Sequence, residues 1–145
     1  MLKVETSLVI HRSVEDVFAV LNELENYPKW SATFQEITKT STGPTGVGTT
    51  WTGVGKSLGR RIETKIEQTE YEPNRKYTRK SNSPFPVHEQ MTFESIEGGT
   101  RVNVRFEAEP GGFFKLAEPL VAKIGKRNIE GDLAALKDLM EAHAL

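Results

Sequence analysis

The chain has 145 residues, a length that suits one domain able to bury about two thirds of its unfolded-chain surface without disulfide staples. Its 19 lysines and arginines nearly balance 20 aspartates and glutamates, so no broad positive field favours nucleic acid or an anionic membrane. With no cysteine and no run of 18 apolar residues, the sequence predicts no disulfide framework, thiol nucleophile, signal peptide or membrane span. We therefore expect a single cytoplasmic domain, residues 1–145.

The first part of the chain predicts one strand followed by two short helices. In residues 3–10 apolar and polar side chains alternate, which is typical of a strand with one buried face. Ser13 is a candidate N-cap, and the apolar residues that follow it recur at helical spacing. Pro28 disfavours helical backbone at Tyr27, so a short turn that carries Trp30 is expected after the helix.

The middle of the chain, from 33 to 109, predicts strands only. Breakers such as TGPTGVG and IEGGT separate short segments that lack helical periodicity. In the segment RRIETKIEQTEY, Thr64 and Ile66 share one side of the strand and charged residues occupy the other, as a half-solvated antiparallel strand requires. With the first strand, six more make seven in total, and they are expected at 34–41, 47–54, 60–71, 75–82, 87–97 and 100–109.

The last part of the chain, 113–144, predicts one long helix. It is rich in helix-forming residues, and its apolar residues recur at helical spacing from Leu120 to Met140. Pro119 lies near its beginning, where a missing backbone donor costs least. A seven-stranded antiparallel sheet twists and has to cover one face, and only this helix is large enough to cover it. The predicted class is therefore α+β, with a space between sheet and helix that is only partly filled.

Five segments carry a recognisable pattern over nearly the whole chain: VETSLVIHRSVEDVFAVLNELENYPKW, GVGTTW, IEQTEYEPNRKYTRK, EGGTRVNVRFEAEPGG and KRNIEGDLAALKDLME. Together they resemble the START-like, birch-pollen-allergen-like (SRPBCC) superfamily, in particular its polyketide cyclase/dehydrase and lipid-transport branch. The resemblance implies the helix-grip fold, a seven-stranded antiparallel sheet wrapped around a long C-terminal helix, with two short helices between strands 1 and 2. Because the superfamily includes cyclases, lipid carriers and hormone receptors, the fold does not settle the function.

The same resemblance implies an internal cavity whose entrance is bordered by the two short helices. Tyr27 and Trp30 would then be rim residues, the alternative being that Trp30 packs in the core with its indole N–H bonded to a carbonyl. Phe85 lies between two prolines in SNSPFPVHE, where a regular strand is disfavoured, and is expected at the cavity mouth. The alternative for Phe85 is a hairpin-loop position tucked onto the surface.

Strand parity points several polar residues inward as well. If Tyr77 packs inside, Arg79 shares its face, and if Met91 packs inside, Glu89 shares its face. A hairpin centred near Pro84 would place Arg79 opposite Glu89 on adjacent strands, the alternative being an outward-facing pair on the solvated face. The predicted wall of a cavity of ~300 Å³ or more comprises Thr64, Ile66, Tyr77, Met91, Phe93, Val104, Val121, Ile124 and Asn128, with Arg79, Glu89 and Phe85 as further ligand contacts.

The sequence predicts neither a metal site nor a cofactor. His11, His88 and His143 have no ligand spacing of the zinc type, and GVGTTW lacks the lysine and the helix start of a phosphate loop. The expected partner is a small hydrophobic molecule, with no nucleic acid and no membrane span, and the expected assembly is a monomer or a homodimer.

Three functions are compatible with this pattern. The leading one is binding of a small apolar or aromatic ligand, lipid- or polyketide-like, for which burial of ~300 Å² of ligand surface gives roughly 7 kcal/mol before association costs. The second is an aromatase/cyclase-type enzyme acting on a polyketone in the same cavity, with Arg79, Glu89 and Tyr77 as candidate proton-transfer groups. The third is a partner-binding module with a residual cavity.

Overall fold

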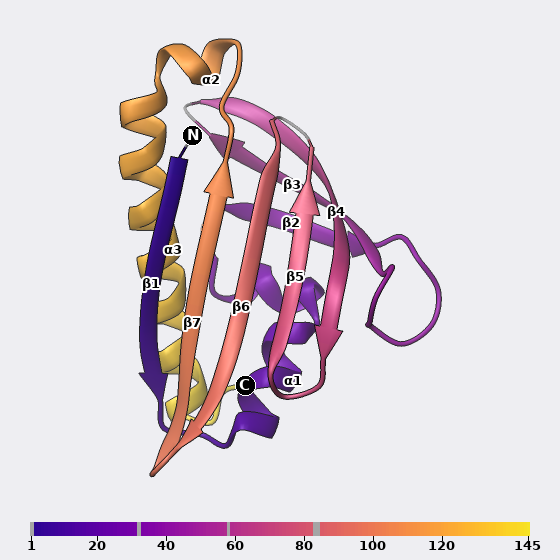
Figure 1. Cartoon of the computed structure of the whole chain (residues 1–145), viewed down its shortest axis with the longest axis vertical. Coiled ribbons are helices and arrows are strands. Elements are labelled where there is room, and N and C mark those ends of the chain that lie inside the picture. Colours follow the sequence, from indigo (N-terminus) through magenta and orange to yellow (C-terminus); the bar gives the residue numbers. More distant parts are fainter. Residues whose placement is uncertain (1, 32, 58, 83–84) are drawn as a thin grey trace.

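A curved sheet wraps around one long helix in the computed structural model, which describes residues 2–31, 33–57, 59–82 and 85–145 (Figure 1). The elements are β1 (Leu2–Ile10), α1 (Val14–Asn22), the 3₁₀-helix η1 (Leu24–Lys29), β2 (Phe34–Lys39), β3 (Thr50–Ser57), β4 (Arg60–Glu72), β5 (Lys76–Ser81), β6 (Val87–Ile96), β7 (Gly99–Ala108), α2 (Phe113–Leu116) and α3 (Glu118–Glu141).

The seven strands of the described chain form one antiparallel sheet in the order β1-β7-β6-β5-β4-β3-β2. Strands β2 to β7 pair with their neighbours in sequence, whereas β1 pairs with the last strand, β7. Register shifts between Phe34 and Glu36 on β2 and between Gln68 and Glu70 on β4 interrupt the ladders. Such irregularities increase local twist, which helps the sheet to curve around a helix.

The two expected short helices are present between β1 and β2. Ser13 caps α1, since its side chain accepts a hydrogen bond from the backbone N–H of Asp16. The buried face of α1 carries Val17, Phe18 and Leu21. Where a short turn was expected, the chain forms η1. The 3₁₀-helix contains Pro28, and its C-terminal turn closes when the N–H of Trp30 donates to the carbonyl of Tyr27.

Strand β3 and the C-terminal helix differ most from the sequence prediction, and the other strands differ from it by at most two residues at either end. Strand β3 runs from Thr50 to Ser57 rather than 47–54, because Gly43 and Gly48 adopt positive φ in the preceding loop. The C-terminal helix is divided into α2 and α3 at Ala117. Pro119 has no N–H to donate to the carbonyl of Lys115, which instead accepts from the N–H of Ala117.

The main core fills one half of the space between sheet and helices. Phe18 of α1 packs edge-on against Phe93 of β6, with ring centroids 5.0 Å apart. The same cluster contains Ile10, Val17, Leu21, Trp30, Tyr77, Met91, Val102, Val104, Leu133, Leu136 and Met140. Helix α1 and the C-terminal half of α3 therefore close this half of the sheet.

Hydrogen bonds to the end of β1 and to the residue that follows it fix the C-terminal half of helix α3. Lys137 Nζ donates to the carbonyl of Val9 at 2.6 Å, and the Glu141 carboxylate accepts from the backbone N–H of His11 at 2.9 Å. The buried residues of α3 lie between positions 132 and 140. The first half of α3 packs only partly buried side chains, Val121, Ala122 and Ile129, against the sheet. No described helix is both long and apolar enough to cross a membrane.

Candidate ligand-binding cavity

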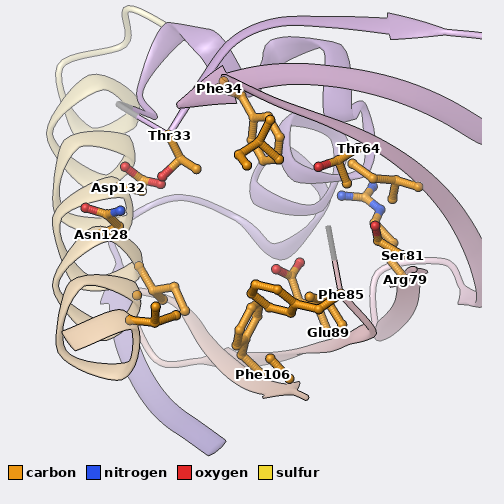
Figure 2. A pocket seen from close by; sticks show the side chains of 18 of the residues that line it. Thr33, Phe34, Thr64, Arg79, Ser81, Phe85, Glu89, Phe106, Asn128 and Asp132 are labelled. Carbon is orange, nitrogen blue, oxygen red and sulfur yellow. The ribbon is translucent and has the colours of Figure 1, made fainter. Parts of the chain in front are cut away.

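A cavity of about 240 Å³ lies between the first half of α3 and the inner face of the sheet (Figure 2). Its wall is mainly apolar, with Phe34, Phe106 and Phe114 among the lining side chains. The volume is smaller than the ~300 Å³ expected, and it lies below the usual range of ligand pockets, so it suits only a compact ligand. The cavity exists because α3 carries only half-exposed or exposed side chains over this part of the sheet.

Many of the residues predicted for the cavity border it in the structure. Phe85 is one of them, and its ring meets that of Phe114 edge-on with centroids 5.2 Å apart. The others are Tyr27, Thr64, Ile66, Arg79, Glu89, Val121, Ile124 and Asn128. Contact of any of these side chains with a ligand remains a prediction.

Another group of predicted wall residues belongs to the closed core instead. Tyr77, Met91, Phe93 and Val104 do face inward, but α1 and the C-terminal half of α3 fill the space in front of them. The Tyr77 hydroxyl donates to the Met91 sulfur at 2.7 Å, and burial raises the pKa of Tyr77. Their expected place at the cavity wall is therefore corrected, and Tyr77 loses its position as a candidate proton-transfer group.

The two residues expected at the rim, Tyr27 and Trp30, also lie in different parts of the structure. Trp30 is buried in the core cluster, which agrees with the core packing of its alternative, and of the two residues Tyr27 borders the cavity. The two rings meet edge-on at 5.6 Å between centroids. Tyr27 therefore connects the core to the cavity.

The sequence analysis missed a number of wall residues, among them Phe34, Phe106 and Asp132. Phe106 shares the inward parity of Val104 on β7, so the signal was present but was not used for the cavity. Asp132 lies one helical turn after Asn128 on α3, a spacing that also pointed to it. Phe34 gave no signal, because the register shift on β2 breaks the alternation there.

Arg79 joins β5 to the end of α1. Its Nε donates to Gln68 Oε1 at 2.9 Å, and its Nη2 donates to the carbonyls of Asn22 at 2.8 Å and Leu21 at 3.3 Å. The guanidinium also lies over the Tyr77 ring at 3.9 Å. A cation at the C-terminal carbonyls of a helix is favourable, and the side chain is only 4% exposed. Arg79 thus has a structural role that explains why it is buried.

Glu89 lies directly opposite Arg79 on β6, so the predicted cross-strand pair is confirmed. The centre of the predicted hairpin, near Pro84, lies outside the described residues. Figure 2 shows the Glu89 carboxyl pointing into the cavity. Within the described ranges, no residue forms a hydrogen bond or an ion pair with this carboxyl. Burial raises the pKa of Glu89, and Asp132 raises it further, while Arg79 lowers it.

Two other polar side chains reach the cavity from different elements. Asp132 of α3 is buried and accepts a hydrogen bond from the Ser31 hydroxyl at 2.8 Å. Tyr27 comes from η1, and burial raises its pKa well above the usual value, with Glu89 and Asp132 adding to the effect. In the part of the chain that the structure describes, no three His, Asp or Glu side chains gather into a metal-binding group.

A helix-grip fold with an internal, mostly apolar cavity is thus defined by the sheet, the two short helices and α3. A profile of the family described as polyketide cyclase / dehydrase and lipid transport matches residues 1–141. The chain belongs to this family, and the resemblance seen in the sequence is confirmed.

Solved structures of similar fold support the same architecture. A protein from Thermus thermophilus is 20% identical, with a TM-score of 0.82 and 99% of each chain covered. A START superfamily protein from Mycobacterium smegmatis is 14% identical, with a TM-score of 0.80 over 98% of this chain and 99% of that chain. The ZhuI aromatase/cyclase from Streptomyces sp. R1128 is 12% identical, with a TM-score of 0.79 over 99% of this chain and 95% of that chain. Identities this low show a common fold alone, and no curated protein matches the sequence.

Proposed function

We propose that the protein binds a small apolar or aromatic molecule, lipid- or polyketide-like, in the cavity between the sheet and α3. The observation that carries the proposal is the cavity of about 240 Å³ with mainly apolar walls, beneath a half-helix whose side chains are at most partly buried. Apolar burial provides the driving force for a ligand in such a space. The aromatic rings along the wall favour a flat or aromatic guest.

Gly125 offers a way to test this proposal without weakening the fold. It borders the cavity on α3, and a side chain added there would begin in open space. Gly131 lies on the same helix, is exposed and has similarly free surroundings, so it provides a matched control. Leucine is a better helix former than glycine by roughly 0.8 kcal/mol at either position.

The expected result is that Gly125→Leu and Gly131→Leu both fold at least as stably as the wild type, but only Gly125→Leu loses the ligand. The probe is 2-ethylnaphthalene, and binding is measured by naphthalene fluorescence and by the rise in melting temperature. Equal binding by both variants would show that the probe does not enter the cavity. If no apolar probe binds the wild type, the remaining function is recognition of a partner at the surface.

A second candidate is an aromatase/cyclase-type enzyme, favoured by Glu89 and Tyr27, whose pKa values are both raised at the cavity wall. A carboxyl group with a raised pKa can transfer protons near neutral pH. The test is conversion of a linear poly-β-ketone to a cyclised, dehydrated product, followed by mass spectrometry against the spontaneous reaction. Glu89→Gln would abolish conversion while leaving 2-ethylnaphthalene in the cavity, and conversion that persists in this variant would exclude Glu89.

A further inference from the structure

The Glu89 carboxyl lines the cavity and forms no hydrogen bond or ion pair with the described residues. Its cross-strand neighbours are Arg79 on β5 and Phe106 on β7. Arg79 directs Nε to Gln68 and Nη2 to the last carbonyls of α1, so these donors do not reach Glu89. Phe106 offers no hydrogen-bonding group. The carboxyl therefore faces the space that a ligand would fill (Figure 2).

The surroundings of Glu89 determine which ligand chemistry fits beside it. A carboxylate ligand would lose its water and meet both Glu89 and Asp132. An ammonium ligand would also lose its water and would lie near the buried Arg79 cation. A neutral carbonyl loses far less solvation energy on entering an apolar space than either ion.

Burial of Glu89 raises its pKa and favours the protonated form, which can donate a hydrogen bond; the Arg79 cation lowers this pKa, and Asp132 raises it. The groups that face it are Arg79 from β5, Asp132 from α3 and Tyr27 from η1, with Lys56 and Lys80 at the border of the cavity. Burial is the largest cause of the raised pKa of Glu89. The O–H donor is therefore retained above the usual pKa of 4.5 and is lost as the pH rises through the raised value.

We propose that Glu89 selects neutral apolar ligands that carry a hydrogen-bond acceptor, such as a ketone, ester or quinone carbonyl, over hydrocarbons, carboxylates and amines. This inference rests on the proposed ligand-binding function and specifies its ligand class. The carbonyl oxygen accepts a hydrogen bond from the Glu89 carboxyl, and the apolar body of the ligand lies against the aromatic wall. Free fatty acids are thereby disfavoured.

The test uses four probes with one naphthalene skeleton: 2-acetylnaphthalene, 2-ethylnaphthalene, 2-naphthoate and protonated 1-(2-naphthyl)ethylamine. The wild type is expected to bind the ketone about tenfold more tightly than the hydrocarbon, as one added hydrogen bond allows, and the two ions more weakly than the hydrocarbon. Above the usual carboxyl pKa of 4.5 this preference for the ketone persists, and it falls as the pH rises through the raised pKa and Glu89 ionises. Affinities are measured by fluorescence titration at each pH.

Three variants separate the donor from the shape of the side chain. Glu89→Gln keeps an N–H donor, so its preference for the ketone over the hydrocarbon remains and becomes independent of pH. Glu89→Leu has no donor, and the ketone and the hydrocarbon bind equally. Glu94→Leu, on the exposed face of the same strand, retains the wild-type preference and its pH dependence. Thermal unfolding checks that each variant is folded, and if Glu89→Leu is not, the pH profiles of the wild type and Glu89→Gln decide.

The outcomes distinguish this inference from the function on which it rests. Equal affinities of the wild type for the ketone and the hydrocarbon would overturn the role of Glu89 and leave the proposed function intact. Tighter binding of the amine that increases with pH would also overturn it, because Glu89 would then act as an anion. Absence of binding by all four probes would overturn both proposals.

Discussion

The direction of the Arg79 side chain could be predicted from the sequence, but its hydrogen-bond partners could not. Strand parity and the hairpin register predicted its inward direction and its position opposite Glu89, and both are correct. The parity argument did not predict the bonds of the guanidinium, because Gln68 and the end of α1 come from other elements. Five donors on one planar group can satisfy several acceptors at once, and here they stabilise the junction of α1 with the sheet.

We expect Arg79→Met to lower the free energy of unfolding by about 3 kcal/mol, because buried acceptors on Gln68, Leu21 and Asn22 lose their donor. Glu89→Leu should change stability far less, and the double variant should show a coupling below about 0.5 kcal/mol. Urea denaturation of the four proteins measures the cycle. A coupling above about 1 kcal/mol would instead mean that the two charges stabilise one another directly.

The control for this cycle is Lys80→Met. Lys80 is the next residue of β5, lies on the exposed face, and forms an ion pair of 3.9 Å with Glu67. Exposed pairs of this kind contribute about 0 to 1 kcal/mol, so its loss should be small.

At the scale of elements, α3 consists of two halves with different neighbours. The C-terminal half contributes Leu133, Leu136 and Met140 to the core, while Leu120 in the first half is 50% exposed. Helical periodicity continues through both halves, so the sequence predicted a helix without showing which half is packed. The neighbours of each half are set by where α1 and β1 lie, which periodicity within α3 does not encode.

Backbone amides at 120–130 are therefore expected to exchange with deuterium faster than those at 132–141, because fewer buried contacts oppose local opening of the first half. Saturation with 2-ethylnaphthalene should slow exchange at 120–130, since the ligand binds only the closed helix. Mass spectrometry of peptides from the labelled protein gives both values. Gly125→Leu should remove the ligand effect, and uniform exchange along α3 would contradict the division into halves.

Across the whole molecule, the inner face of the sheet is continuous but only half of it is covered by the core. Tyr77 and Arg79 lie on the same face of β5. Tyr77 packs in the core, whereas Arg79 borders the cavity. The resemblance and the alternation of side chains were sufficient for the helix-grip fold and for the inner face. The boundary between core and cavity was not predictable, because it depends on how far α1 and α3 extend over that face.

This division predicts different costs for truncating side chains in the two halves. Leu136→Ala, at a position that is fully buried, should lower stability by about 3 kcal/mol. Ile124→Ala should cost only about 1 kcal/mol, because its side chain already borders open space. Urea denaturation measures both, and 2-ethylnaphthalene titration should show a change of affinity for Ile124→Ala alone. Similar losses of stability would mean that the cavity half is packed as tightly as the core.

The pairing of β1 with β7 has a consequence for the order of folding. Strand β1 lies at an edge of the sheet, and its register joins Leu2 to Ala108 and Ile10 to Thr100. During synthesis β1 leaves the ribosome before the other strands but has no sheet partner until β7 follows it. Closing so long a loop is entropically costly and slow, so the hairpins from β2 to β7 are expected to form before it. Strand β1 would thus be the last to join the sheet and the segment most in need of protection from aggregation.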